Sequence, residues 1–260
     1  MFSSKQKNNM ISKNMIKYIR SLEMKKNRER EGMFVAEGPK IVSDLIAESN
    51  PKIIVATQEW LNSNKIDNKV ERISVSETEL KKISFLQHPQ QVIGIFPIPK
   101  SETDTTICNK ELCLALDKIQ DPGNLGTIIR IADWFGISTI FCNEGTVDAF
   151  NPKVVQATMG SIARTRLIYT DLPSMLASLP DNTPIYATSL DGLNIYEQKL
   201  TNTGIIIMGN EGNGISPQIM KKVNNKLFIP SYRKTRNIDS LNVAIATAIT
   251  CAEFKRRNTL

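Results

Sequence analysis

The sequence predicts an α/β protein, and three observations support this class. Apolar, strand-like runs alternate with helix-like segments at short spacing along most of the 260-residue chain. Ile205, Ile206 and Ile207 show no polar alternation, which is typical of a strand buried on both faces of a parallel sheet. The glycine-rich loop GNEGNG follows that run directly, and loops after such strands commonly hold ligands.

Composition narrows the class of protein. The length favours two domains, and a hydrophobic fraction of 41% is enough for two cores. The net charge of +7 favours a polyanionic partner such as nucleic acid. No run approaches the ~18 apolar residues of a membrane span, and the N-terminus lacks a signal-peptide core. Four cysteines without a CxxC pair and one histidine argue against metal sites and disulfides. We therefore expect a cytoplasmic protein without membrane or metal.

Residues 1–97 are predicted to form a small α/β domain. Met10–Arg30 has the apolar spacing of a helix that ends at Gly32, followed by alternating strands and helices, one with a capping box at Ser76–Glu79. Basic residues fill the other positions of the first helix: Lys13, Lys17, Arg20, Lys25, Lys26, Arg28 and Arg30. They form either a solvated face or a cationic surface for phosphates. His88, beside a proline, is interpreted as structural or exposed.

Residues 98–110 are rich in Ser, Thr and charge and are predicted to be a linker. Residues 111–260 continue the alternation of strands and helices, which indicates a mainly parallel sheet with helices on both faces. After the first strand, Pro122-Gly123 predicts a tight turn, and Asn124 stands where a helix N-cap belongs. Gly136 closes that helix. The chain has neither GxxxxGK[ST] nor GxGxxG between the first strand and its helix.

Polar residues interrupt these apolar elements in three places. Asn124 and Arg130 are six residues apart, so on one helix they face different ways and converge only if Asn124 precedes the helix. Arg130 lies inside the apolar run TIIRIAD and is expected to pair with an anion. Glu211 lies in the glycine loop, and Ser240 and Asn242 lie at the start of the last helix. The simpler interpretation of Asn124 and Ser240 is that each is a helix cap. Arg130 would then be a surface arginine and Glu211 a solvated turn residue. Asn242 would be a buried amide, which needs hydrogen-bond partners.

Three segments together carry a family resemblance: DPGNLGTIIRIADWFGI, IMGNEGNGIS and IPSYRKTRNIDSLNVAIATAI. In this order they resemble the motifs of the SpoU (TrmH-type) RNA ribose 2′-O-methyltransferases of the SPOUT, or α/β-knot, superfamily. The resemblance covers residues 111–257. The N-terminal SKNMIKYIRSLEMKKNREREGMFVAEG is similar to the ribosomal-protein-like RNA-binding domain that many of these enzymes carry.

The resemblance implies a trefoil-knotted domain that binds S-adenosylmethionine, in a homodimer whose sites are built from both subunits. It implies cofactor contacts at Thr188, Gly209, Ile229 and Leu241. It assigns catalytic roles to Asn124, Arg130, Glu211, Ser240 and Asn242. Because no histidine lies near the motifs and arginine is a weak base, with a pKa above ~12, we interpret Arg130 as a phosphate anchor and as a candidate base, held by Glu211 and Asn124.

The chain departs from the family pattern in two places: the loop Ser231–Asp239 is longer and more basic, and Ala244 replaces a common serine. The leading hypothesis is a methyltransferase acting on ribosomal (23S-type) RNA, which the separate N-terminal domain favours. The alternatives are a transfer-RNA 2′-O-methyltransferase and a non-catalytic RNA-binding or ribosome-assembly factor. The intact set of motif residues argues against the last of these.

Overall fold

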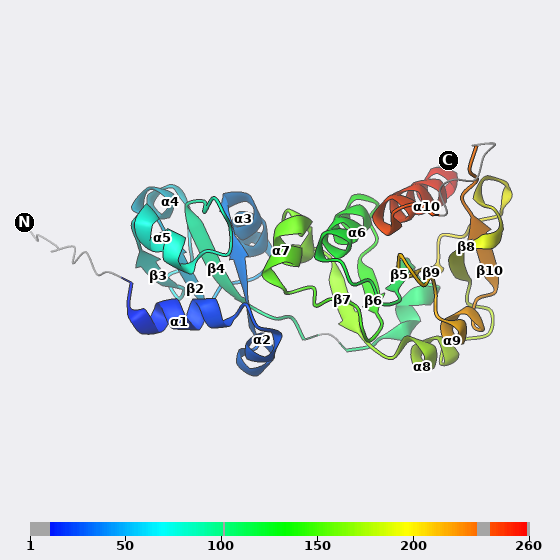
Figure 1. Cartoon of the computed structure of the whole chain (residues 1–260), viewed down its shortest axis with the longest axis horizontal. Helices are drawn as coiled ribbons and strands as arrows, with labels where there is room; N and C mark the ends of the chain where they lie inside the picture. The colour runs from blue at the N-terminus through cyan, green and yellow to red at the C-terminus, as the bar shows by residue number, and fades with distance from the viewer. Residues whose placement is uncertain (1–10, 101, 233–239, 259–260) are drawn as a thin grey trace, which may run out of the picture. The chain divides into compact units, whose positions relative to one another are not determined.

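The computed structural model describes residues 11–100, 102–232 and 240–258 and divides into two compact units (Figure 1). The first contains the described residues up to Pro99 together with Phe150–Ala163. The second contains Lys100–Ala149 and the described residues from Arg164 onward. The segment 150–163, which the sequence analysis placed in the C-terminal part, thus lies with the first unit. No helix in the described ranges is both long and apolar enough to cross a membrane.

The first unit is built on a four-stranded mixed sheet of order β1-β4-β2-β3. β4 runs antiparallel to β1 and β2, whereas β2 and β3 are parallel. The strands are β1 (Met33–Glu37), β2 (Ile53–Ala56), β3 (Glu71–Ser74) and β4 (Val92–Pro97). The helices are α1 (Lys13–Ser21), α2 (Lys25–Glu31), α3 (Pro39–Glu48), α4 (Gln58–Ser63), α5 (Glu77–Ile83) and α7 (Pro152–Thr158), with the 3₁₀ turn η2 (Ser161–Ala163). The predicted strands and the Ser76–Glu79 capping box are confirmed.

The predicted single helix over Met10–Arg30 is wrong, because the chain breaks it between α1 and α2. Arg28 is 1% exposed and donates hydrogen bonds to the carbonyls of Leu22 (2.8 Å) and Glu23 (2.7 Å) at the break. This guanidinium satisfies carbonyls that a helix end leaves unpaired. Arg28 is therefore a structural residue and not part of the cationic face. Gly32, with a φ of 63°, ends α2 as predicted.

The second unit contains a six-stranded sheet of order β10-β8-β9-β5-β6-β7, in which each pair of neighbours is parallel. Its strands are β5 (Leu112–Leu116), β6 (Thr139–Cys142), β7 (Arg166–Tyr169), β8 (Ile185–Asn194), β9 (Gly204–Met208) and β10 (Asn225–Phe228). Its helices are α6 (Pro122–Trp134), α8 (Leu172–Ala177), α9 (Pro217–Met220) and α10 (Val243–Asn258), with the 3₁₀ turns η1 (Thr105–Asn109) and η3 (Ile195–Glu197).

This unit has the predicted layers. Ile205, Ile206 and Ile207 of the central strand β9 are fully buried. Residues of α8 and α9 pack against Ile205 and Ile207 on one face, and α6 and α10, which contact each other, lie on the other face (Figure 1). Apolar residues cover both faces, so the strand needs no polar alternation.

Three neighbouring strands, β10, β8 and β9, end at the same edge of the sheet because they are parallel. β10 pairs with β8 in two registers: Lys226 lies opposite Ala187, and Leu227 lies opposite Leu193. Residues 188–192 therefore leave the ladder as an excursion. At Gly192 a Cβ would stand 2.6 Å from the backbone carbon of Leu227, so only glycine allows this approach.

Candidate functional site at the carboxyl edge of the parallel sheet

Helix α6 starts earlier than the sequence suggested. Asp121 is its N-cap, accepting from the backbone N–H of Asn124 at 2.7 Å, and Pro122 occupies the first turn. Proline fits there because its missing N–H would be unpaired in any case. The predicted tight turn at Pro122-Gly123 and the N-cap role of Asn124 are therefore wrong. Asn124 lies in the first helical turn, and its side chain is free for other contacts.

The glycine loop after β9 is closed on itself. Asn210 and Gly214 exchange backbone hydrogen bonds of 3.0 and 2.9 Å. The Asn210 Oδ1 atom accepts from the backbone N–H of Gly212 at 2.9 Å. At Gly209 a Cβ would lie 2.4 Å from the carbonyl carbon of Gly214, so the two ends of the loop touch through backbone alone. This closure presents Glu211 at the tip of the loop, exposed.

Asn124, Glu211 and Asn242, one from each of the three motifs, are joined by hydrogen bonds. The Nδ2 of Asn124 donates to Oε1 of Glu211 at 2.5 Å. The Oδ1 of Asn124 accepts from Nδ2 of Asn242 at 2.9 Å. Asn242 in turn accepts from the backbone N–H groups of Ala244 and Ile245, as the N-cap of α10. Asn242 is exposed, so the prediction of a buried amide is wrong, although it does have partners.

Arg130 does not join this cluster. It lies on α6, exposed, and forms no hydrogen bond or ion pair with any residue that the structure describes. Six residues of α-helix turn the side chain by about 600°, which leaves it about 120° from that of Asn124. The expected pairing of Arg130 with Glu211 is absent, and no anionic partner of the guanidinium lies within the described residues.

The remaining predicted residues flank this edge. Thr188 begins the β8 excursion and lies 3.8 Å from the Met208 sulfur, through its Oγ1. Ile229 follows β10 and is half-buried. Ser240 and Leu241 precede α10, and both are exposed. Residues 233–239, most of the longer basic loop, lie outside the described residues.

Two residues that the sequence analysis missed fix the glycine loop. Asp117, 1% exposed, accepts from Nδ2 of Asn143 at 2.8 Å and from the backbone N–H of Ser216 at 2.7 Å. Lys118, in the left-handed region with φ 59°, accepts from Nδ2 of Asn210 at 2.9 Å through its carbonyl. The sequence does contain a signal for Asp117. Its carboxylate comes directly after the apolar run LCLAL, and a charge that is buried there needs hydrogen-bond donors.

Two protein-family models match the chain, one in each of its two parts. Residues 111–252 match the model of the SpoU rRNA Methylase family, and residues 13–94 match an MRM3-like substrate binding domain. A 23S rRNA (guanosine(2553)-2′-O)-methyltransferase, RlmP, of Bacillus subtilis is 30% identical over 237 residues, which span 90% of this chain and 93% of the relative. Human mitochondrial rRNA methyltransferase 3 is 33% identical over 66% of this chain and 43% of its own length.

Solved structures resemble the chain over nearly its whole length. A protein of the TrmH family from Porphyromonas gingivalis superposes with a TM-score of 0.89 at 39% identity, covering 96% of this chain and all of that one. An AdoMet-bound rRNA methyltransferase from Sinorhizobium meliloti superposes with a TM-score of 0.83 at 30% identity, covering 96% and 97% of the two chains.

Proposed function

Because the chain belongs to the SpoU rRNA Methylase family, we propose that it is an S-adenosylmethionine-dependent ribose 2′-O-methyltransferase of 23S-type ribosomal RNA. The observation that carries the proposal is the hydrogen-bonded chain Glu211–Asn124–Asn242. It joins residues from three distant motifs at the edge where the predicted cofactor loops end. Polar groups held in this way can orient a reacting hydroxyl.

The residues at this edge fit S-adenosylmethionine. Gly192 and Gly209 bring backbone into contact with backbone, where a Cβ would be excluded. Leu241, 48% exposed, and half-buried Ile229 offer apolar surface near the loop ends. Thr188, Gly209, Ile229 and Leu241 would hold the cofactor, which supplies an electrophilic methyl group when bound.

The chain's own residues then have to orient the ribose and remove a proton from its 2′-hydroxyl. Asn124 and Asn242 would position the ribose, Glu211 would fix the Asn124 amide, and Ser240 would lie beside them at the start of α10. The guanidinium of Arg130, unpaired among the described residues, would bind a substrate phosphate and polarise the hydroxyl. We propose Arg130 as a phosphate anchor and as a candidate base, although an arginine base needs strong assistance.

Because Arg130 and Asn124 of one α6 point in different directions, a homodimer would let a second subunit complete the site. We propose that each site combines Asn124, Glu211 and Asn242 of one subunit with the partner subunit's Arg130. Large apolar side chains on this unit are exposed and would be covered in such a dimer: Trp134 (84%), Leu190 (73%), Leu193 (64%) and Ile245 (52%).

The path of the last segment supports a knot. β10 lies at the end of the sheet, beyond β8, whereas α10 packs against α6, which follows β5. β10 and α10 are thus consecutive elements that lie at different positions on the sheet. We propose that the trefoil knot of the superfamily forms at this part of the fold and that it shapes the cofactor pocket.

We propose that residues 1–97 form the domain that binds the RNA and that residues 98–110 link it to the methyltransferase domain. Lys13, Lys17 and Lys26 are exposed there and available to phosphates, and exposed Lys25 pairs with Glu29 at 3.7 Å. The proposed substrate places the enzyme in the compartment that contains ribosomes, the cytoplasm.

Mapping of 2′-O-methyl groups on total RNA, from cells with and without this protein, tests the function directly. We expect one 23S-type ribosomal site to disappear and to return with the wild-type gene. Loss of a transfer-RNA methyl group instead would assign the other substrate. No change, together with no calorimetric binding of S-adenosylmethionine, would indicate a non-catalytic RNA-binding protein.

A further inference from the structure

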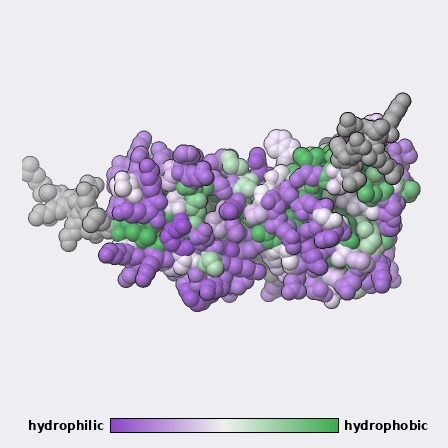
Figure 2. Space-filling model, viewed as in Figure 1, coloured by the Kyte–Doolittle hydropathy of each residue, from purple (hydrophilic) through white to green (hydrophobic). Residues whose placement is uncertain are grey.

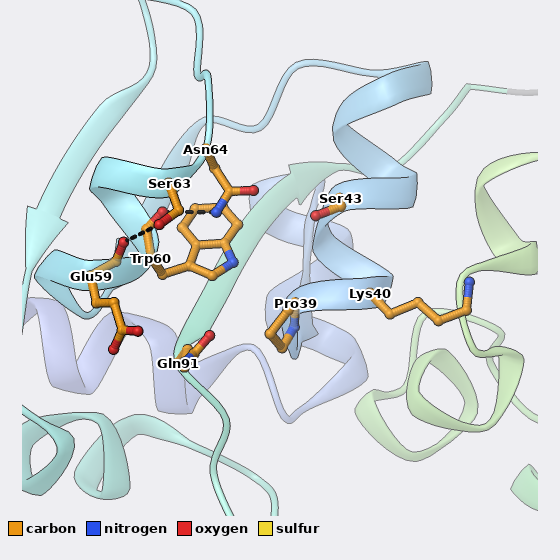
Figure 3. Close-up of a pocket in the computed structure, with 8 residues that line it drawn as sticks. All are labelled: Pro39, Lys40, Ser43, Glu59, Trp60, Ser63, Asn64 and Gln91. Atoms are coloured by element: carbon orange, nitrogen blue, oxygen red, sulfur yellow. Dashed lines mark hydrogen bonds between the residues drawn. The ribbon is translucent and has the colours of Figure 1, made fainter.

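A cavity of about 380 Å³ lies in the first unit, between α3 and α4. Figure 3 shows it with its lining residues, which come from α3, α4 and the segment before β4. They are Pro39, Lys40, Ser43, Glu59, Trp60, Ser63, Asn64 and Gln91. Cavities of roughly 300–1,000 Å³ hold small organic ligands.

Trp60 is the chemical centre of this cavity. Only 4% of the residue is exposed, and its indole N–H donates to no residue that the structure describes. Figure 3 shows the indole nitrogen turned toward α3, across the cavity. The indole nitrogen is not among the fully buried atoms that lack a partner, so it is accessible from the cavity and can donate to an acceptor on a ligand there.

The other polar groups around the cavity divide into occupied and free ones. Asn64 Nδ2 donates to the carbonyl of Trp60 at 2.8 Å, which leaves its Oδ1 as an acceptor. The Ser63 hydroxyl donates to the carbonyl of Glu59 at 2.9 Å. The Ser43 hydroxyl and the Gln91 amide have no partner among the described residues. The free set is thus one fixed donor, one fixed acceptor and two groups that can do either.

Charge excludes a phosphate from the cavity itself. Lys40 pairs with Asp44 of its own helix at 3.1 Å, and Figure 3 shows its side chain leading away from the cavity. The remaining charged lining residue, Glu59, would repel an anion. A purely apolar ligand would leave the indole N–H unpaired. The lining fits a neutral, planar heterocycle with both donors and acceptors.

We propose that this cavity binds one unpaired nucleobase of the RNA substrate and so helps to select the RNA. The proposal rests on the RNA methyltransferase function above. Single-stranded bases are recognised through hydrogen bonds to their exposed edges, which the groups of Trp60, Asn64, Ser43 and Gln91 supply.

The two tryptophans of the chain allow a direct test. We expect the indole ¹H–¹⁵N signal of Trp60 in the full-length protein to shift saturably with at least one of the four ribonucleoside 5′-monophosphates. It should shift at lower concentration with an unstructured RNA oligonucleotide, and not with a blunt RNA duplex. Trp60→Phe assigns the signals of the two tryptophans. A Trp60 signal that no nucleotide or oligonucleotide moves overturns the proposal.

Kinetics provide the second test. Ser43→Ala and Asn64→Ala should each raise the KM for the RNA about two- to tenfold, the worth of one hydrogen bond, with kcat and cofactor affinity unchanged. Ser63→Ala is the matched control, because its hydroxyl is already paired within the chain. Equal KM values for all three variants contradict the proposal. The nucleotide titration needs no methyl transfer, so it remains informative even if the proposed enzymatic function fails.

Discussion

The side-chain amide of Asn124 donates to the carboxylate of Glu211 at 2.5 Å, although 87 positions separate the two residues. This bond ties the first turn of α6 to the tip of the glycine loop. Asn242, bonded to the other end of the same amide, adds the start of α10. Each of the three polar residues thus lies after a different strand: Asn124 after β5, Glu211 after β9 and Asn242 after β10.

Asn124→Asp should lower kcat by at least about tenfold, since a hydrogen bond to a charged group contributes ~1.5–3 kcal/mol. The new carboxylate would face Glu211 and would offer no N–H to it. Steady-state methyl transfer to 23S-type RNA measures this. Binding of S-adenosylmethionine, measured by calorimetry, should stay close to the wild-type value, and Asn124→Ala is the control that removes the bond without adding charge. Unchanged kcat in the aspartate variant would show that the bond is not used.

Arg130→Ala should abolish methyl transfer while leaving cofactor binding nearly intact. If the partner's Arg130 completes each site, inactive Arg130→Ala and Asn124→Ala subunits should complement each other. Random mixing gives half heterodimers with one intact site each, so we expect about a quarter of wild-type activity. Activity that stays at zero in the mixture would place Arg130 in its own subunit's site, and full activity of Arg130→Ala alone would remove its catalytic role.

Gly209 and Gly212 form a matched pair in the glycine loop. A Cβ at Gly209 would stand 2.4 Å from backbone of Gly214, whereas at Gly212 the nearest atom, Oδ1 of Asn210, is 3.5 Å away. Gly209→Ala should therefore weaken S-adenosylmethionine binding and lower the melting temperature, and Gly212→Ala should change neither. Calorimetry and thermal unfolding measure the two effects. If the two variants have the same cofactor affinity and melting temperature, the loop accommodates a Cβ at Gly209 without loss of stability, which contradicts the prediction.

The apolar runs made most strands of both sheets predictable, because these strands are covered on at least one face. Ile205–Ile207 is the clearest case: its burial from both sides leaves no position for a polar residue. The glycine loop and the capping box could also be predicted, since glycine allows tight turns and the Ser-x-x-Glu pattern caps the start of a helix. Those local signals do not depend on the rest of the fold.

What escaped prediction depends on distant contacts. Asp121 and Asn124 are both good N-cap residues, and Pro122 in the first helical turn decides for Asp121. Arg28 looked like one more residue of a basic face, but the carbonyls of Leu22 and Glu23 hold it inside. The role of Asp117 follows from its hydrogen bonds with Asn143 and Ser216, which are distant from it in the sequence. A residue's burial is set by partners that sequence spacing does not reveal.

Arg28 and Lys26 should separate stability from RNA binding. Arg28→Ala leaves the buried carbonyl of Leu22 without its donor. A buried unpaired group costs about 1–3 kcal/mol, so urea unfolding should occur at clearly lower concentration. Lys26→Ala, at an exposed position, should leave unfolding unchanged. It should reduce the slope of log K for RNA against log salt by about 0.7–0.9 if Lys26 contacts a phosphate. An unchanged slope would assign Lys26 to the solvated face instead.

Glu37 gives the first unit a pH-dependent stability. Its burial raises the pKa of the carboxyl above the ordinary value, and the hydrogen bonds from Ser84 and from the Phe85 N–H offset this only in part. The folded state therefore binds the proton more tightly than the unfolded chain. The contribution of Glu37 is complete below the ordinary glutamate pKa of about 4.3 and is lost as pH rises through the raised pKa.

Glu37→Gln imitates the neutral form at every pH, so its stability relative to the wild type should increase as pH rises from 4 to 8. Urea unfolding at several pH values, followed by Trp60 fluorescence in a Trp134→Phe background, measures the difference in the unit that contains Glu37. Ser49→Ala, a change on the same unit without a carboxyl, should keep a constant difference from the wild type across the range. A glutamine variant that loses stability relative to the wild type as pH rises would mean that the hydrogen bonds to the carboxylate outweigh the cost of burying it.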